Sequence, residues 1–415
     1  MYDLVSLGKA ARQASMKLRT SDTNTRNAAL CAIAASLREN MPEILEANRL
    51  DLATARAAGI RSVMIDRLTL NADRIRGIAD AAEEVSRLAD PIGVIDMGTT
   101  RPNGLQILKT RVPIGVVAMI FEARPNVTVD AAVLCLKSGN ACILRGGKEA
   151  FATNRALARL MREAVEKSGL PADSIGLVED TSHETAERLM KLNGYIDVLI
   201  PRGSARLIRS VVENATVPVI ETGAGNCHMY VDRAADLGMA VEIVDNGKTQ
   251  RPSVCNALET VLVHRDVATE FLPMMKARLD LHNVELRGCE RTCQILRSIK
   301  RASEEDWATE YNDFILAVKI VDSLDEAIAH IAAYSTGHSD GIVTNDLAAS
   351  RRFTAEVDSA AVYVNASTRF TDGGEFGLGA EIGISTQKLH ARGPMGLSDL
   401  TSIKYIVTGD GQIRS

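Results

Sequence analysis

Cys255 is the strongest candidate nucleophile in the sequence. It lies in the segment Gln250-Arg-Pro-Ser-Val-Cys-Asn-Ala257, directly before the apolar run 258–263, and so at the edge of an expected strand rather than inside it. A free thiol has a pKa of about 8.5, and the nearby cations Lys248 and Arg251 would favour the reactive thiolate if they fold beside it. An inert, buried cysteine is the alternative reading.

Two further polar residues have positions that suit catalysis beside a nucleophile. Asn126 follows an expected strand and the pair Arg124-Pro125, so its amide could donate to an oxyanion, although it could equally cap a helix over 127–137. Glu221 ends an expected strand and precedes Gly-Ala-Gly, so its carboxylate could act as an acid or base, or could be a surface charge in a turn.

Two basic turns are candidates for phosphate binding. Arg145-Gly146-Gly147-Lys148 and Arg202-Gly203-Ser204 combine cations with glycines that let a backbone approach an anion. The standard glycine-rich nucleotide fingerprints are missing from the sequence, and ordinary basic turns are the alternative for both segments.

An alternating pattern of strands and helices would bring these residues together. Helices are expected over the first 90 residues, a β-hairpin over 92–111, and a doubly wound parallel sheet over 112–232. The expected strands of that sheet lie near 114–121, 141–145, 175–178, 196–200 and 217–220. Ligands bind beyond the carboxyl ends of parallel strands, so the polar loops after these strands should converge on one crevice.

Composition narrows the classes of protein that remain. The chain has 415 residues, which suits two domains, and its formal net charge of −5 disfavours nucleic acid as a partner. No apolar run is long enough to span a bilayer and the first residues do not form a signal sequence, so we expect a cytoplasmic location and no membrane partner. Cys289 and Cys293 lack the further ligands of a zinc site, and we expect no bound metal.

Taken in order, these residues resemble the aldehyde dehydrogenase superfamily, and within it the γ-glutamyl phosphate reductase family. The resemblance covers essentially the whole chain. It is carried by P-I-G-V-V-A-M-I-F-E-A-R-P-N-V-T (113–128), I-L-R-G-G-K-E-A (143–150), I-P-R-G-S (200–204), V-I-E-T-G-A-G-N-C-H (219–228), K-T-Q-R-P-S-V-C-N-A-L-E-T (248–260) and G-A-E-I-G-I-S-T-Q-K-L-H-A-R-G-P-M-G-L (379–397).

The resemblance implies an α/β, aldehyde-dehydrogenase-like fold with two doubly wound parallel-sheet domains and a β oligomerisation arm. The implied cofactor-binding domain comprises 1–91 and 112–227, with 366–399 returning to it; the catalytic domain comprises 228–365, and the arm comprises 92–111 and 400–415. A homo-oligomer follows from the arm, and a glutamate 5-kinase is a candidate partner because it would supply the acyl phosphate.

The implied reaction is the second step of proline biosynthesis from glutamate, in which NADPH reduces L-glutamate 5-phosphate to L-glutamate 5-semialdehyde and phosphate through a thioester on Cys255. Asn126 would stabilise the oxyanion. Glu221 matches the position of the superfamily's general base, which a reductase does not need. The residues implied for the cofactor are Arg145, Gly146, Gly147, Lys148, Pro201, Gly203, Ser204 and Glu310, with Lys148 favouring NADPH over NADH; those implied for the anions of the substrate are Arg124 and Arg251.

Three other functions remain open at this stage. The chain could be another acylating aldehyde dehydrogenase that uses coenzyme A, or a catalytically silent assembly partner. A cysteine hydrolase is the third alternative, but it would need a histidine base beside the nucleophile, and none of the seven histidines has that position.

Overall fold

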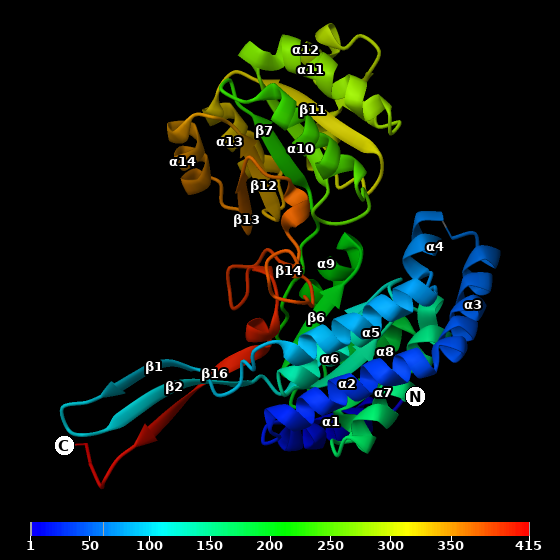
Figure 1. The fold of residues 1–415 in the computed structure, drawn as a ribbon, viewed down its shortest axis with the longest axis vertical. Coiled ribbons are helices and arrows are strands. Elements are labelled where there is room, and N and C mark those ends of the chain that lie inside the picture. The colour runs from blue at the N-terminus through cyan, green and yellow to red at the C-terminus, as the bar shows by residue number, and fades with distance from the viewer. Residues whose placement is uncertain (1, 61, 415) are drawn as a thin grey trace. The chain divides into compact units, whose positions relative to one another are not determined.

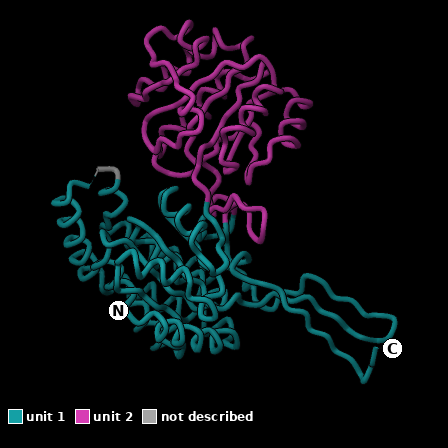
Figure 2. The backbone as a smooth tube through the Cα atoms, turned by 180° about the vertical axis from the view of Figure 1, so that it is seen from behind, with its two compact units in different colours: residues 1–222, 377–383, 395–415 teal, residues 223–376, 384–394 magenta. Residues whose placement is uncertain are grey.

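The computed structural model describes residues 2–60 and 62–414, which divide into two compact units (Figure 2). Unit 1 comprises residues 1–222, 377–383 and 395–415, and unit 2 comprises 223–376 and 384–394. The sequence assigned 223–227, 366–376 and 384–394 to the first domain instead. These segments belong to unit 2 because they bond to it: Gly223 donates its N–H to the carbonyl of Ile384, and residues 368–371 bond to Asn256.

Unit 1 contains a four-stranded parallel sheet in the order β5-β4-β3-β6. Its strands are β3 (Val116–Phe121), β4 (Ala141–Arg145), β5 (Ile175–Leu177) and β6 (Val198–Arg202). The segment expected as a fifth strand at 217–220 forms only a single bridge, between Val219 and Leu199. Its proline explains this, because Pro218 has no N–H to donate to a neighbouring strand.

Helices flank this sheet and fill the N-terminal part of unit 1 (Figure 1). They are α1 (Leu4–Leu18), α2 (Thr23–Glu39), α3 (Met41–Ala57), α4 (Ser62–Leu68), α5 (Ala72–Arg87), α6 (Asn126–Lys137), α7 (Phe151–Lys167), α8 (His183–Met190) and α9 (Ala205–Asn214), with the short 3₁₀ helices η1 (Lys148–Ala150), η2 (Ala172–Ser174) and η5 (Leu397–Leu400). The residue before several of these helices caps the first turn with its side chain. Asp22 accepts the N–H of Thr25 before α2, and Asn71 accepts the N–H of Arg74 before α5.

A separate three-stranded antiparallel sheet forms the arm of unit 1, in the order β1-β2-β16. Its strands are β1 (Ile95–Thr100), β2 (Gln106–Pro113) and β16 (Thr401–Thr408). Figure 1 shows this ribbon extending from the helical part of unit 1. The expected hairpin is therefore present, and the C-terminal tail is its third strand.

Unit 2 contains a seven-stranded sheet, all parallel, in the order β10-β9-β11-β8-β7-β12-β13. The strands are β7 (Cys227–Val231), β8 (Leu258–His264), β9 (Glu285–Gly288), β10 (Lys300–Arg301), β11 (Ile315–Val321), β12 (Ser339–Val343) and β13 (Ala361–Val364); β14 (Ile384–Ser385) and β15 (Gly393–Pro394) form a small pair. The helices are α10 (Leu237–Thr249), α11 (Arg265–Asp280), α12 (Glu290–Ile295), α13 (Leu324–Tyr334) and α14 (Leu347–Glu356), with η3 (Glu304–Ala308) and η4 (Thr368–Phe370).

Alternation along the central strands gives this sheet two apolar faces. Met229 and Val231 pack in a core with α10 and α11, whereas Tyr230 between them packs in a second core with α13 and α14. Helices therefore cover both faces, which is the doubly wound arrangement expected from the sequence.

Asn140 joins the central sheet of unit 1 to the arm. Its side-chain oxygen accepts from the N–H of Gly115, just before β3, at 2.8 Å, and its amide donates to the carbonyl of Leu400, just before β16, at 2.8 Å. The residue is fully buried, so water cannot replace these partners.

We predict that Asn140→Ala lowers the free energy of unfolding of unit 1 by about 2 kcal/mol, because two buried backbone groups lose their partner. Urea unfolding followed by circular dichroism measures the change. Asn214→Ala, at the exposed end of α9, is the matched control and should shift the midpoint little. Equal midpoints for the two variants would contradict the prediction.

Candidate active site

Cys255 lies in the loop between α10 and β8, as the sequence predicts, and its side chain is half-buried. Gly225 packs directly against this loop: a Cβ on Gly225 would overlap the carbonyl oxygen of Cys255 and lie 2.6 Å from its Cα. The thiol of Cys227 donates to the same carbonyl at 3.2 Å. Only glycine fits at 225, so Gly225 brings two backbones together.

Glu310 holds the other side of Gly225. Its carboxylate accepts the N–H of Gly225 at 2.8 Å, and the amide of the following Asn226 donates to the carbonyls of Trp307 and Tyr334, each at 2.8 Å. The structure thus gives Glu310 a structural role next to the Cys255 loop. Its predicted contact with the nicotinamide ribose stays a prediction.

The segment that presents Glu310 is itself anchored by Asp306. This carboxylate accepts from the backbone and hydroxyl of Ser303, from Arg287 at 2.7 Å and from Tyr311 at 2.8 Å. Partial burial raises the pKa of Asp306, but these hydrogen bonds outweigh it and hold the pKa at about 2. Asp306 is therefore charged at any physiological pH and keeps 303–311 fixed.

Lys248 does not have the role expected from its closeness to Cys255 in the sequence. Its ammonium is fully buried and lies 2.6 Å from the carboxylate of Glu259, which is also fully buried. Burial lowers the pKa of Lys248 and raises that of Glu259 to about 8, while their mutual attraction opposes both changes. The pair joins the end of α10 to the start of β8, on either side of the Cys255 loop, and its two charges largely cancel.

Arg251 is exposed. A second arginine, which could not be found from the sequence, contacts the same loop from a distant segment. Arg369, on η4, donates to Gln250 and Asn256; burial lowers its pKa, and the charge of Cys255 opposes this change. No spacing in the sequence signals this contact, because Arg369 comes more than 100 residues after the loop.

Within unit 1, Asn126 is the first residue of α6. The cap position belongs to Pro125 and no side chain caps this helix, so the capping alternative for Asn126 is wrong. Its amide instead donates to Asp130, one turn later, at 2.8 Å. Burial raises the pKa of Asp130 to about 6, although the hydrogen bond from Asn126 lowers it.

The turn before Asn126 has a strained backbone. Ala123 has a φ of 48°, a conformation that costs a residue with a Cβ roughly 1–2 kcal/mol, and its N–H is held by the carboxylate of Glu149 at 2.8 Å. Arg124 and Asn126 are therefore presented by a fixed, sharp turn at the carboxyl end of β3.

The first basic turn is more structural than the sequence suggested. The guanidinium of Arg145 is buried and donates to the carbonyls of Thr181 and Ser182, and burial lowers its pKa. A Cβ on Gly146 would overlap the amide of Asn154, so its neighbours explain that glycine. Lys148 is exposed, at the start of η1.

The second turn ends β6 and begins α9. Pro201 is in the strand, and Ser204 is the N-cap of α9, accepting from the N–H of Leu207 at 3.3 Å. Ser204 also donates its own N–H to Glu122, whose carboxylate lies against Gly203. Glu221 is half-buried, two residues beyond the bridge between Val219 and Leu199.

The predicted residues thus fall into two groups, each within one unit. Unit 2 brings Cys255, Arg251 and Glu310 together around one loop. In unit 1, the sheet is parallel, so Asn126, Lys148 and Ser204 follow the same carboxyl edge. Convergence of loops on one edge was expected from the strand pattern.

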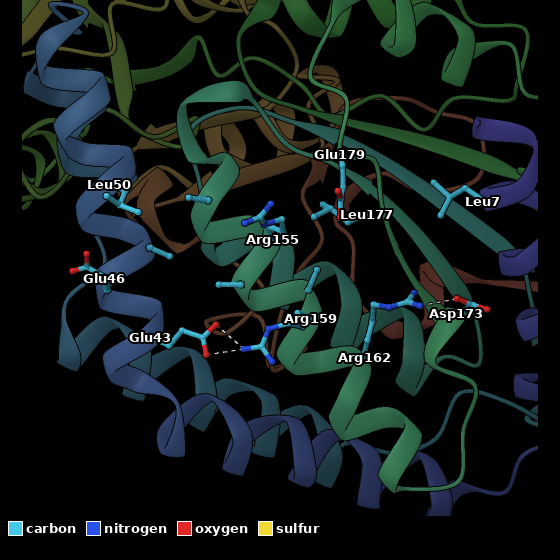
Figure 3. Close-up of a pocket in the computed structure, with 14 residues that line it drawn as sticks. Leu7, Glu43, Glu46, Leu50, Arg155, Arg159, Arg162, Asp173, Leu177 and Glu179 are labelled. Carbon is cyan, nitrogen blue, oxygen red and sulfur yellow. Dashed lines mark hydrogen bonds and ion pairs between the residues drawn. The ribbon is translucent and has the colours of Figure 1, made fainter. Parts of the chain in front are cut away.

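A pocket of about 790 Å³ in unit 1 contains none of the predicted site residues (Figure 3). It is lined mainly by α3 and α7. Four of its charged side chains pair with one another: Arg159 bonds to Glu43, and Arg162 bonds to Asp173.

Among residues 2–60 and 62–414, no group of three or more histidine, cysteine or acidic side chains is arranged to hold a metal ion. No helix among these residues is long and apolar enough to cross a membrane.

The chain resembles known proteins over its full length. Residues 3–295 match the model of the aldehyde dehydrogenase family. The chain is 57% identical over 406 residues to a γ-glutamyl phosphate reductase of Caldanaerobacter subterraneus subsp. tengcongensis, covering 98% of each protein. It is 58% identical over 414 residues to that of Carboxydothermus hydrogenoformans, covering 100% of each.

The chain belongs to the γ-glutamyl phosphate reductase family, within the aldehyde dehydrogenases. The crystal structure of the γ-glutamyl phosphate reductase from Thermotoga maritima matches it with a TM-score of 0.96 and 48% identity, covering 100% of each chain. The family and the fold expected from the sequence are both confirmed.

We predict that Gly225→Ala lowers turnover by about 100-fold or more, because the new methyl group must push the Cys255 backbone out of place. Steady-state rates measure the loss. Gly238→Ala in α10, where the nearest atom to a new Cβ is 3.4 Å away, is the control and should leave turnover within about twofold. Normal turnover in Gly225→Ala would show that the contact is not needed.

Proposed function

We propose that this protein reduces L-glutamate 5-phosphate to L-glutamate 5-semialdehyde and phosphate with NADPH, through a thioester on Cys255. This is the second step of proline biosynthesis from glutamate. The observation that carries the proposal is the full-length identity of 57–58% to proteins named for this activity. The intact Cys255 loop argues against a silent assembly partner.

Cys255 performs the first chemical step. Its thiolate attacks the γ-acyl carbon, a C–S bond forms, and the C–O bond to phosphate breaks, so that phosphate leaves with the electron pair. After reduction, the C–S bond of the thiohemiacetal breaks, the aldehyde leaves, and the thiolate is regenerated. The contacts of Gly225 and Cys227 to the Cys255 carbonyl support this role, because they fix the backbone that carries the thiol.

The oxyanion formed in each addition needs hydrogen-bond donors, and the proposal assigns this role to the amide of Asn126 and the N–H of Cys255. A side-chain amide has two N–H donors. Asp130 takes one of those of Asn126 and fixes the orientation of the group. Glu221 is given no catalytic step, because hydride transfer to the thioester needs no activated water.

The residues after the strands of unit 1 fit a dinucleotide phosphate. The N-terminus of α9 favours an anion at the N–H groups that follow Ser204, whose own N–H donates to Glu122, and the exposed Lys148 offers a cation at the same edge of the sheet. A bound NADPH would be the source of the hydride that reduces the thioester. Arg145 would hold the turn in place through its bonds to the carbonyls of Thr181 and Ser182. The backbone next to the phosphates would be formed by Gly146, Gly147, Pro201 and Gly203.

The anionic groups of the substrate, its phosphate and its α-carboxylate, need cations near the reacting carbon. Arg124, on the strained turn before Asn126, and Arg251, on the Cys255 loop, are the proposed partners. The exposure of Arg251 supports this, because its guanidinium is accessible to a ligand.

The arm supports a homo-oligomer. The last strand, β16, is exposed along almost its whole length and carries Ile403, Tyr405 and Val407, of which Tyr405 is 58% exposed. Apolar side chains on an edge strand are a surface that another copy of the chain would cover. A glutamate 5-kinase as partner and a cytoplasmic location stay predictions.

The reverse reaction tests the proposal: NADP reduction with glutamate semialdehyde should require phosphate. We predict that Cys255→Ala lowers this rate at least about 1,000-fold, because the covalent intermediate cannot form. Cys289→Ala, at the start of α12, is the control and should keep the wild-type rate. Activity that needs coenzyme A instead of phosphate would favour the other acylating dehydrogenases, and activity in Cys255→Ala would remove it as the nucleophile.

The choice of cofactor is tested separately. We predict that Lys148→Glu raises the KM for NADPH about tenfold or more and changes that for NADH little, because only NADPH carries the 2′-phosphate that the cation would bind. Initial rates with both cofactors measure this. A wild-type preference for NADH that Lys148→Glu leaves unchanged would refute the assignment.

A further inference from the structure

One side chain from outside the Cys255 loop bonds to both ends of it. Arg369 lies on η4, and its Nε donates to the side-chain oxygen of Gln250 at 2.9 Å. Its Nη1 donates to the side-chain oxygen of Asn256. Gln250 and Asn256 lie on either side of Cys255 in the sequence, so the guanidinium connects the two ends of the loop.

The backbone around Arg369 fixes this bridge in place. Thr368 donates its hydroxyl to the carbonyl of Asn256 at 2.8 Å, and the amide of Asn256 donates to the carbonyl of Thr371 at 2.9 Å and to that of Arg369 at 3.3 Å. Asn256, the residue next to Cys255, is therefore bonded through both its backbone and its side chain. Arg369 cannot shift without moving the residue beside the thiol.

The charge of Arg369 acts on the thiol as well. Burial lowers the pKa of the guanidinium, and the negative charge of Cys255 raises it again. An arginine stays protonated in proteins despite such a change. Its two side-chain hydrogen bonds go to amide oxygens, so no carboxylate is bonded to it and its charge is left to act on its surroundings.

The other charged groups around the loop do not replace it. Lys248 and Glu259 neutralise each other, the carboxylate of Glu310 bonds to Gly225, and burial raises the pKa of Cys227 well above the usual range, so that thiol is neutral. The remaining groups that act on Arg369 are Arg251, which is exposed, and Asp372, which is an exposed carboxylate.

We propose that Arg369 is a positioning residue for Cys255: it closes the loop that carries the thiol, and its positive charge favours the thiolate form. The proposal rests on the proposed role of Cys255 as the nucleophile. It assigns separate tasks to the shape and the charge of one side chain, and substitutions can separate them.

The test follows alkylation of Cys255 by iodoacetamide as a function of pH, with mass spectrometry of the Cys255 peptide as the readout. Only the thiolate reacts, so the midpoint of the profile reports the pKa of the thiol without substrate or cofactor. We predict that Arg369→Gln moves the midpoint up by about one unit and lowers the rate at pH 7 about tenfold.

Arg369→Lys separates charge from shape. It keeps the positive charge, so we expect a midpoint close to that of the wild type. It cannot reach both Gln250 and Asn256 with a planar fork, so turnover in the phosphate-dependent assay should stay about tenfold lower, with little change in KM. Arg352→Gln, on the exposed face of α14, is the control and should match the wild type in both assays.

Two results would overturn the proposal. One is an alkylation profile of folded Arg369→Gln that coincides with that of the wild type. Should this variant not fold, Arg369→Lys decides instead: a midpoint that moves up by about one unit, although the positive charge is kept, would equally refute the role. Because alkylation requires no turnover, absence of phosphate-dependent activity in the wild type would contradict the proposed function without deciding this point.

Discussion

The contact between Gly225 and the carbonyl of Cys255 is the constraint on which the rest of unit 2 depends. It leaves no room for a Cβ, so the chain must place a glycine two residues before β7 and hold two irregular backbones together. Everything around the contact serves to keep them there. Glu310 and Asn226 hold one backbone, while Cys227, the Lys248–Glu259 pair and Arg369 hold the other.

Charge around the proposed nucleophile is arranged by burial. The two groups of the Lys248–Glu259 pair are fully removed from water, and such a pair contributes position rather than net charge. Arg369 in the same region donates to neutral amide oxygens, so its positive charge is not neutralised by these partners. A loop can thus be held by one ion pair and influenced electrostatically by a different cation.

Much of this could be predicted from the sequence. The alternating pattern over 112–232 predicted the sheet of unit 1, and the family resemblance predicted that of unit 2. β4 begins and ends at the predicted residues, because the largely apolar stretch between Asn140 and Gly146 leaves little choice. The proposed nucleophile was found because Cys255 precedes a strand. Val217–Ile220 was the exception, since its apolar residues predict a strand that Pro218 interrupts.

Long-range partners could not be predicted in the same way. Lys248 was expected near Cys255 because only seven positions separate them in the chain. The loop folds back, however, so that Lys248 forms an ion pair with Glu259. Arg369 and Asp130 carry no local signal, because their roles exist only once η4 and α6 are packed. The two compact units differ from the predicted domain limits for the same reason: residues 366–376 and 384–394 join unit 2 through bonds to distant segments, and no pattern of hydrophobicity records those bonds.

The arm has a consequence for the synthesis of the chain. Its third strand, β16, pairs with β2, and Arg111 and Thr401 in these strands are 290 residues apart. At ribosomal rates of about 5–20 residues per second, the hairpin of β1 and β2 emerges on the order of 15 to 60 s before its partner strand. During this interval one edge of β2 is open to any other extended chain, including a nascent copy of itself. This edge of β2 closes only when residues 401–408 have left the ribosome and paired with it.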